Sequence, residues 1–247
     1  MCGFVGFIGT KQPDLNLIRT MTSSLAHRGP DSSNIWIDQI DKIALGHTRL
    51  AIIDTSENGS QPMQSYSGRF IITFNGEIYN HIDLRKKLQK DKTHIWIGNS
   101  DTETIIEFIE FYGLEETLKV VKGMFAFAVW DKKNKELFLA RDIAGEKPLY
   151  YGYQNGCLIF GSELKALKLH SEFDKKIDNK AISMFMKYSY IPEPLSVYEK
   201  TKKLPPGCYI KLKYKSLNDN IKVNKYWDLS ENINNESDNY LNLNTSR

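Results

Sequence analysis

The sequence predicts an α+β fold in which two antiparallel sheets carry helices on their outer faces. From residue 123 onward, short apolar runs alternate with turn-forming residues, a pattern typical of hairpins. Helical periodicity is confined to a few isolated segments, so strands and helices do not alternate as in a doubly wound parallel sheet. With 247 residues and 41% apolar composition, the chain is long enough to bury one large core.

The individual elements follow from local pattern. Residues 2–8 form an apolar run with two glycines, which favours a strand that another group approaches closely. Apolar residues have helical spacing in residues 14–26, 82–90, 102–112 and 179–187. Further strands are expected at residues 35–37, 43–46, 69–74, 125–130, 136–141, 149–153, 158–160 and 208–214. The Asn75-Gly76 pair after residue 74 predicts a tight turn.

The chain changes character near its end. Residues 191–207 are rich in proline and predict an extended loop. Residues 216–247 contain nine asparagines and few apolar side chains. We therefore expect one domain over residues 2–214 and a polar linker or tail over 215–247, and we expect the natural protein to continue beyond it.

Composition excludes several classes of function. The net charge is +3, from 33 basic and 30 acidic residues, which does not predict a nucleic-acid partner. The longest apolar run, Met124–Trp130, is too short to cross a bilayer, and no signal peptide is evident. The three cysteines are widely spaced and form no Cys-x-x-Cys motif, so we expect no disulfide framework, no metal site and a cytoplasmic location.

Cys2 stands directly after the initiator methionine. Removal of Met1 would give a residue that carries both a thiol and an α-amine, and the amine could take the thiol proton. The alternative is a small hydrophobe buried in the first strand, and position alone favours that alternative.

Five further motifs change this balance. They are residues 27–31 (His-Arg-Gly-Pro-Asp), 49–54 (Arg-Leu-Ala-Ile-Ile-Asp), 61–63 (Gln-Pro-Met), 75–80 (Asn-Gly-Glu-Ile-Tyr-Asn) and 123–128 (Gly-Met-Phe-Ala-Phe-Ala). Together with Cys2-Gly3 they resemble the class II glutamine amidotransferase domain of the N-terminal nucleophile hydrolases, in the branch of glutamine-hydrolysing asparagine synthetases. The resemblance covers about residues 2–210. It implies a four-layer αββα sandwich.

The resemblance also implies the catalytic residues. Cys2 matches the nucleophile, and Asn75 and Gly76 match an oxyanion hole made of a side-chain and a backbone N–H. A plain turn is the alternative for that pair. The implied reaction is attack of the Cys2 thiolate on the glutamine amide, release of ammonia and hydrolysis of a thioester.

The remaining matched residues would bind glutamine. Arg49 matches the residue that holds the α-carboxylate, with a structural salt bridge as the alternative. Glu77 and Asp101 match acidic groups near the substrate ammonium, although Asp101 could also cap a helix. The backbone of Leu50, Ile52 and Ile53 matches a segment that lines the pocket.

Other polar residues and the two remaining cysteines are expected to have no catalytic role. We expect His27, Arg28 and Asp31 to form a structural loop and His47 to be a core histidine, and we expect Cys157 and Cys208 to be inert. The segment 141–151 also resembles the family and is expected to be structural or to face a second domain.

The resemblance leaves the acceptor of the ammonia open. Related synthetases carry a second domain with a Ser-Gly-Gly-x-Asp-Ser loop, and this sequence contains no such loop. We therefore expect no cofactor in this chain, with ATP and Mg²⁺ used only by a synthetase domain on the same or a partner chain, and we leave a homodimer open. Two alternatives remain: the amidotransferase half of an enzyme that amidates sugar acids, and a non-catalytic glutamine-sensing module.

Overall fold

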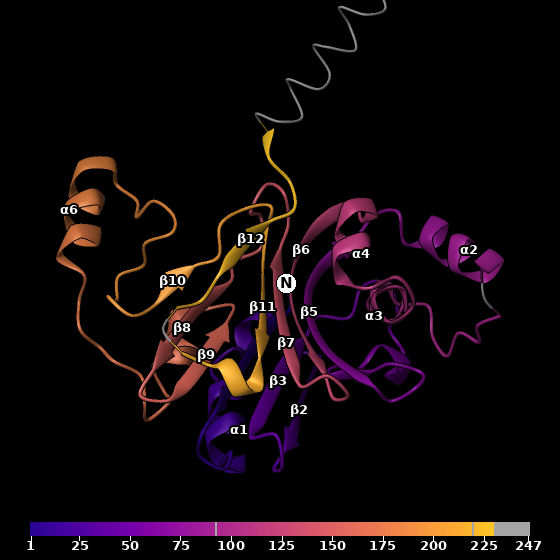
Figure 1. The fold of residues 1–247 in the computed structure, drawn as a ribbon, viewed down its shortest axis with the longest axis horizontal. Coiled ribbons are helices and arrows are strands. Elements are labelled where there is room, and N and C mark those ends of the chain that lie inside the picture. The colour runs from indigo at the N-terminus through magenta and orange to yellow at the C-terminus, as the bar shows by residue number, and fades with distance from the viewer. Residues whose placement is uncertain (92, 219, 230–247) are drawn as a thin grey trace, which may run out of the picture.

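The computed structural model describes residues 1–91, 93–218 and 220–229. Two six-stranded antiparallel sheets pack face to face, and helices cover the outer face of each (Figure 1). This arrangement confirms the predicted four-layer αββα sandwich. The layers matter for function because the first residues of the chain enter the middle of the sandwich.

The first sheet has the strand order β10-β8-β9-β1-β3-β2, and the second has the order β12-β11-β7-β6-β5-β4. The strands of the first sheet are β1 (Gly3–Gly9), β2 (Ser32–Asp38), β3 (Ile43–Arg49), β8 (Tyr150–Gln154), β9 (Cys157–Gly161) and β10 (Lys202–Lys203). Those of the second sheet are β4 (Met63–Gln64), β5 (Phe70–Ile78), β6 (Gly123–Asp131), β7 (Glu136–Arg141), β11 (Cys208–Lys213) and β12 (Val223–Lys225).

Helices lie on both sides of this pair of sheets. α1 and α5 pack on the first sheet, α2, α3 and α4 lie on the side of the second sheet, and α6 stands apart at the left of Figure 1. Their bounds are α1 (Leu15–Ser23), α2 (His81–Asp91), α3 (Asp101–Tyr112), α4 (Leu114–Val120), α5 (Leu164–Leu167) and α6 (Asn179–Tyr188).

The alternation of side chains along β1 builds two of the layers at once. Phe4 and Ile8 are fully buried in the apolar layer between the sheets. Val5 and Phe7 point the other way, where Met21 of α1 covers them. By the same alternation, Cys2 stands on the side of the strand that faces the second sheet.

The second sheet uses its other face to hold α3 and α4. Phe74 of β5 and Phe127 of β6 pack against Ile105, Ile109 and Leu118 of these helices. Each buried side chain of this size contributes roughly 1.5–3 kcal/mol of hydrophobic stabilisation. This packing fixes the start of α3 beside the end of β5.

The tight turn predicted at Asn75-Gly76 is wrong, because β5 continues through Ile78. Asn75 pairs with Ala126 and Gly76 with Phe125 across the ladder to β6. A Cβ atom at Gly76 would overlap the Met124 carbonyl, so the glycine permits close approach of the strands rather than a turn. A local turn signal is here outweighed by long-range strand pairing.

Other differences concern short elements. The expected strand at 43–46 extends to Arg49, and α4, α5, β4 and β10 were not predicted. Within the expected tail, Val223–Lys225 form β12 beside β11, and the Tyr226 hydroxyl donates to the Arg141 carbonyl at 2.8 Å. The ordered sheet thus extends past residue 214, and residues 230–247 of the tail lie outside the described residues. None of the helices in the described ranges has the length and apolar character needed to cross a membrane.

The contact between β3 and α1 provides a test of the packing. A Cβ atom at Gly46 would overlap the Thr22 hydroxyl, which donates to the Ile18 carbonyl at 2.7 Å. We expect Gly46→Ala to lower the free energy of unfolding by about 1–3 kcal/mol, measured by urea denaturation. In a Thr22→Ala background the same change should cost at least about 0.5 kcal/mol less, whereas Thr22→Ser should give no relief. Equal costs in all three backgrounds would contradict this packing.

Candidate active site

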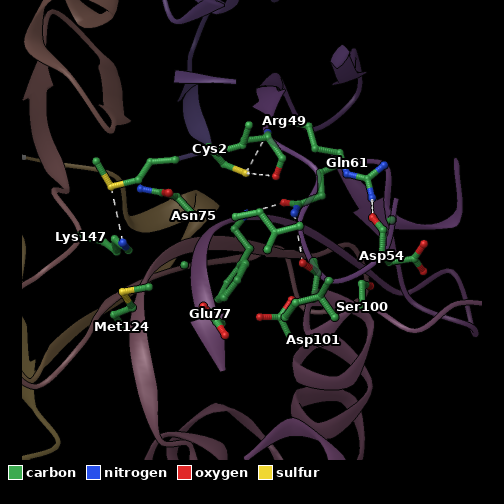
Figure 2. Close-up of a pocket in the computed structure, with 18 residues that line it drawn as sticks. Cys2, Arg49, Asp54, Gln61, Asn75, Glu77, Ser100, Asp101, Met124 and Lys147 are labelled. Atoms are coloured by element: carbon green, nitrogen blue, oxygen red, sulfur yellow. Dashed lines mark hydrogen bonds between the residues drawn. The ribbon is translucent and has the colours of Figure 1, made fainter. Parts of the chain in front are cut away.

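A pocket of about 250 Å³ opens where the start of β1, the end of β3, β5 and the start of α3 meet (Figure 2). The structure brings all nine site residues predicted from the sequence to this pocket: Cys2, Arg49, Leu50, Ile52, Ile53, Asn75, Gly76, Glu77 and Asp101. They come from the residue before β1, the end of β3 and the loop that follows it, β5 and the start of α3.

Cys2 is held by the chain that follows β3. Its Sγ accepts from the Leu50 N–H at 3.4 Å and lies 3.6 Å from the Leu50 carbonyl, to which the thiol donates. Burial raises the pKa of the Cys2 thiol, and the Leu50 N–H and the Arg49 charge oppose that rise only in part. The thiol is therefore protonated at neutral pH unless a base takes its proton.

Arg28 holds the main chain of the same residue. Its Nε donates to the Cys2 carbonyl at 2.9 Å, and its Nη1 forms a 2.9 Å ion pair with Glu163. The motif at 27–31 was expected to form a structural loop, and its arginine has a structural role of that kind. Arg28 positions the cysteine through a contact that the sequence spacing does not show.

Asn75 is fully buried, and neither atom of its amide has a hydrogen-bond partner in the described structure. The side chain lies at the same pocket as the Cys2 thiol (Figure 2). A buried amide without a partner costs about 1–3 kcal/mol of stability. Such a group suits hydrogen bonding to a reacting molecule rather than to the fold.

Arg49, the last residue of β3, is 8% exposed. Its Nη1 donates to the Ser56 carbonyl at 2.8 Å and its Nη2 to the Asp54 carbonyl. Gly59 leaves the space, since a Cβ atom there would overlap Nη2. An arginine has five N–H donors, so others remain for a ligand. No carboxylate is paired with Arg49 in the described structure, which is unlike the salt bridge considered as an alternative.

Two carboxylates stand at the other end of the site. Asp101 is the first residue of α3, and its Oδ2 accepts from the Ile78 N–H at 2.9 Å. Burial raises the pKa of Asp101 to about 6, and the nearby charge of Glu77 adds to the rise. The helix cap is Ser100, whose Oγ accepts from the Glu103 N–H at 3.1 Å, so the capping role considered for Asp101 is wrong.

The remaining titratable candidates lie apart from this chemistry. His47 is buried, its Nε2 donates to the Phe74 carbonyl at 3.0 Å, and burial lowers its pKa to about 4. It is a neutral core histidine, as expected. Cys157 and Cys208 are buried and free, and burial raises the pKa of Cys157 to about 12.

Comparison with known proteins identifies the family. The family described as "Glutamine amidotransferase domain" matches residues 1–227. The chain belongs to this family. Asparagine synthetase [glutamine-hydrolyzing] 1 of Bacillus subtilis is 39% identical over 213 residues, which cover 84% of this chain and 33% of that protein. Asparagine synthetase [glutamine-hydrolyzing] 3 of the same organism is 35% identical over 236 residues, covering 93% and 37%.

A solved structure shares the fold of this glutamine amidotransferase domain. Glutamine phosphoribosylpyrophosphate amidotransferase from B. subtilis superposes with a TM-score of 0.65 at 20% identity, over 92% of this chain and 49% of that one. The chain spans only about a third of the length of the asparagine synthetases that it matches.

Sequence analysis missed several residues of the amidotransferase pocket. Gln61 links β5 to α3 by two hydrogen bonds. Its Oε1 accepts from the Phe74 N–H at 2.6 Å, and its Nε2 donates to the Thr102 hydroxyl at 3.1 Å. Lys147 is 6% exposed, and its Nζ lies 3.5 Å from the Met1 sulfur. Both belong to motifs that carried the resemblance, but only the folded chain shows that they reach the pocket. Among the described residues, no group of three or more His, Cys, Asp or Glu side chains is placed to hold a metal ion.

The raised pKa of Asp101 predicts how stability depends on pH. The folded chain binds this proton more tightly than the unfolded chain, so the residue lowers stability as the pH rises from about 4 to about 6. We expect Asp101→Asn to raise the free energy of unfolding by about 2 kcal/mol at pH 7 and by little at pH 4, in urea denaturation. Asp83→Asn, at an exposed position, is the control and should give no such difference. A gain that is equal at both pH values would show that Asp101 is not destabilised by its charge.

Proposed function

We propose that this domain hydrolyses the side-chain amide of glutamine to glutamate and ammonia. The observation that carries the proposal is the unpaired, buried Asn75 amide at the same pocket as the Cys2 thiol. The family to which the chain belongs, and the glutamine-hydrolysing relatives, support it.

The amino-acid head group would lie between opposite charges. Arg49 suits an α-carboxylate, since its planar fork can give two parallel hydrogen bonds. Glu77 and Asp101 suit the α-ammonium, and the binding of that cation would keep Asp101 ionised. Leu50, Ile52 and Ile53 line the same pocket as Cys2 and these charged groups.

The chemistry would be covalent catalysis at Cys2. Its α-amine takes the thiol proton, and the thiolate attacks the amide carbon. The oxyanion forms beside the Asn75 side-chain N–H and the Gly76 backbone N–H, which would stabilise it. The same proton then passes to the leaving nitrogen, ammonia departs, and water cleaves the thioester to give glutamate.

The relatives support a proposal for the wider role of the protein. Because the chain spans 33–37% of the asparagine synthetases it matches, we propose that the ammonia passes to an ATP-dependent synthetase domain that makes asparagine. ATP and Mg²⁺ would be needed there and not in this domain. The three free cysteines are in keeping with a cytoplasmic location.

Asn75 allows catalysis to be separated from folding. We expect Asn75→Ala to lower kcat for glutamate release by about 10²- to 10³-fold, because it removes one oxyanion donor. The same change should not lower the free energy of unfolding, since the lost amide has no partner in the described structure. Thr73→Val is the matched control, because Thr73 is on the same strand and its buried hydroxyl is also unpaired. A kcat loss of similar size in Thr73→Val would contradict the role of Asn75.

Met1 provides a test of the nucleophile. While Met1 is attached, the Cys2 nitrogen is an amide without basicity, and Met1 itself lines the pocket. We expect protein that retains Met1 to release less than about 1% of the glutamate released by trimmed protein, and removal of Met1 by an aminopeptidase to restore activity. Mass spectrometry alongside the assay establishes which form is present, and trimmed Cys2→Ala should be inactive. Full activity with Met1 on nearly every chain would refute the mechanism.

A further inference from the structure

Asp54 is buried at the edge of the pocket, and both oxygens of its carboxylate are occupied by the protein. Oδ1 accepts from the Ser56 N–H at 2.9 Å and from the Ser56 hydroxyl at 2.6 Å. Oδ2 accepts from the Asn99 N–H at 2.8 Å, across 45 residues of sequence. One carboxylate therefore ties the loop that follows β3 to the loop that precedes α3.

The main chain around Asp54 supports Arg49. The two carbonyls that receive the Arg49 guanidinium belong to Asp54 and Ser56. The Asp54 carboxylate holds these same two residues in a turn through the Ser56 N–H. The position of the guanidinium is thus set by the loop that the Asp54 carboxylate organises.

The second loop that Asp54 contacts, the one before α3, leads directly into Asp101. Asn99 is followed by Ser100, which caps α3, and by Asp101 at the first turn. Arg85 holds this loop from behind, with its Nη1 on the Gly98 carbonyl and its Nη2 on the Ser100 carbonyl, both at 2.9 Å. Arg49, Asp54, Ser100 and Asp101 lie along one side of the pocket (Figure 2). Asp54 bridges the loop that carries the carbonyl partners of Arg49 to the loop that leads into Asp101, and Asn58 adds a second link between these loops, since its Nδ2 donates to the Ile97 carbonyl at 3.0 Å.

We propose that Asp54 is a positioning residue that fixes the spacing between Arg49 and Asp101, and that it thereby selects substrates carrying both an α-carboxylate and an α-ammonium. The inference rests on the proposed function, since it takes these two residues as the head-group ligands. Asp54 touches no reacting atom in this account. It acts on the binding of a molecule that must reach both charges at once.

An amide cannot replace this carboxylate. Asparagine has one acceptor oxygen where aspartate has two. Whichever way the amide of Asp54→Asn is turned, either the Ser56 N–H or the Asn99 N–H faces an NH₂ group. One of the two loops must then move, and the distance between Arg49 and Asp101 changes with it.

Binding is the measurement that tests this, with calorimetry on the chain without Met1, in a Cys2→Ala background that does not turn over substrate. The ligands are glutamine, 4-carbamoylbutanoate, which lacks the amine, and 4-aminobutanamide, which lacks the carboxylate. We expect Asp54→Asn to raise the Kd of glutamine about tenfold. The Kd of each singly charged analogue, read by competition where it is weak, should change less than about twofold, because it uses only one of the two charged residues.

Two further variants accompany it. Glu57→Gln removes a charge from the same loop, where Glu57 accepts from the Ser60 hydroxyl and has no hydrogen bond or ion pair to residues 97–99 in the described structure, so glutamine binding should be unchanged. Gly98→Ala leaves the carboxylate in place but puts a Cβ atom 2.7 Å from its Oδ2. Gly98→Ala should also weaken the binding of glutamine more than that of the two analogues, which keeps the test valid if Asp54→Asn does not fold.

The outcomes are distinct. A selective loss of glutamine affinity in Asp54→Asn or Gly98→Ala supports the proposal. An unchanged Kd for glutamine, or an equal loss of affinity for glutamine and both analogues, overturns it.

Glutamate release by trimmed protein with Cys2 intact is measured separately: in Asp54→Asn, KM should rise while kcat stays within about threefold. Glutamine binding without release in the trimmed parent would refute the proposed hydrolysis and leave the positioning role standing.

Discussion

The placement of β1 between β9 and β3, in the middle of the first sheet, determines where the site can be. An inner strand is paired on both edges and packed on both faces, so the residue before it has little freedom. Cys2 is held at two points: its thiol contacts the Leu50 main chain, and its carbonyl accepts from the Arg28 side chain. The other groups of the pocket are organised around that position, by the end of β3, by β5 and by the start of α3.

The fold class and the site residues could be predicted because both leave local traces. Apolar alternation marks strands, and the motifs around Cys2, Arg49 and Asn75 carry recognisable residue types in order. The strand through Asn75 could not be read locally, because its pairing with β6 lies about fifty residues away. Asp54 and Gln61 were missed for the same reason: their partners are backbone groups of distant segments. Sequence shows which side chains are present, but only packing shows which backbone N–H groups they meet.

The pocket contains groups that weaken the fold. Asn75 leaves its amide unpaired in a fully buried place, and Asp101 keeps a carboxylate where burial disfavours its charge. The Asn75 amide has no partner in the described structure, and the hydrogen bond that Asp101 accepts from the Ile78 N–H does not require a charged side chain. The apolar layers on both faces of the second sheet offset these costs. This distribution, with strain at one pocket and regular packing elsewhere, is what a binding or catalytic site requires.

The proposed nucleophile and the proposed oxyanion donors belong to different sheets, with Cys2 leading into the first and Asn75 within the second. The distance between these groups depends on apolar side chains such as Phe4 and Trp130, which fill the space between the sheets. A small slide of one sheet over the other would leave both sheets intact and yet misalign attack and stabilisation. The rate of turnover would then be more sensitive to the alignment of the two sheets than a probe of secondary structure is. Core residues far from the pocket would therefore help to determine that rate.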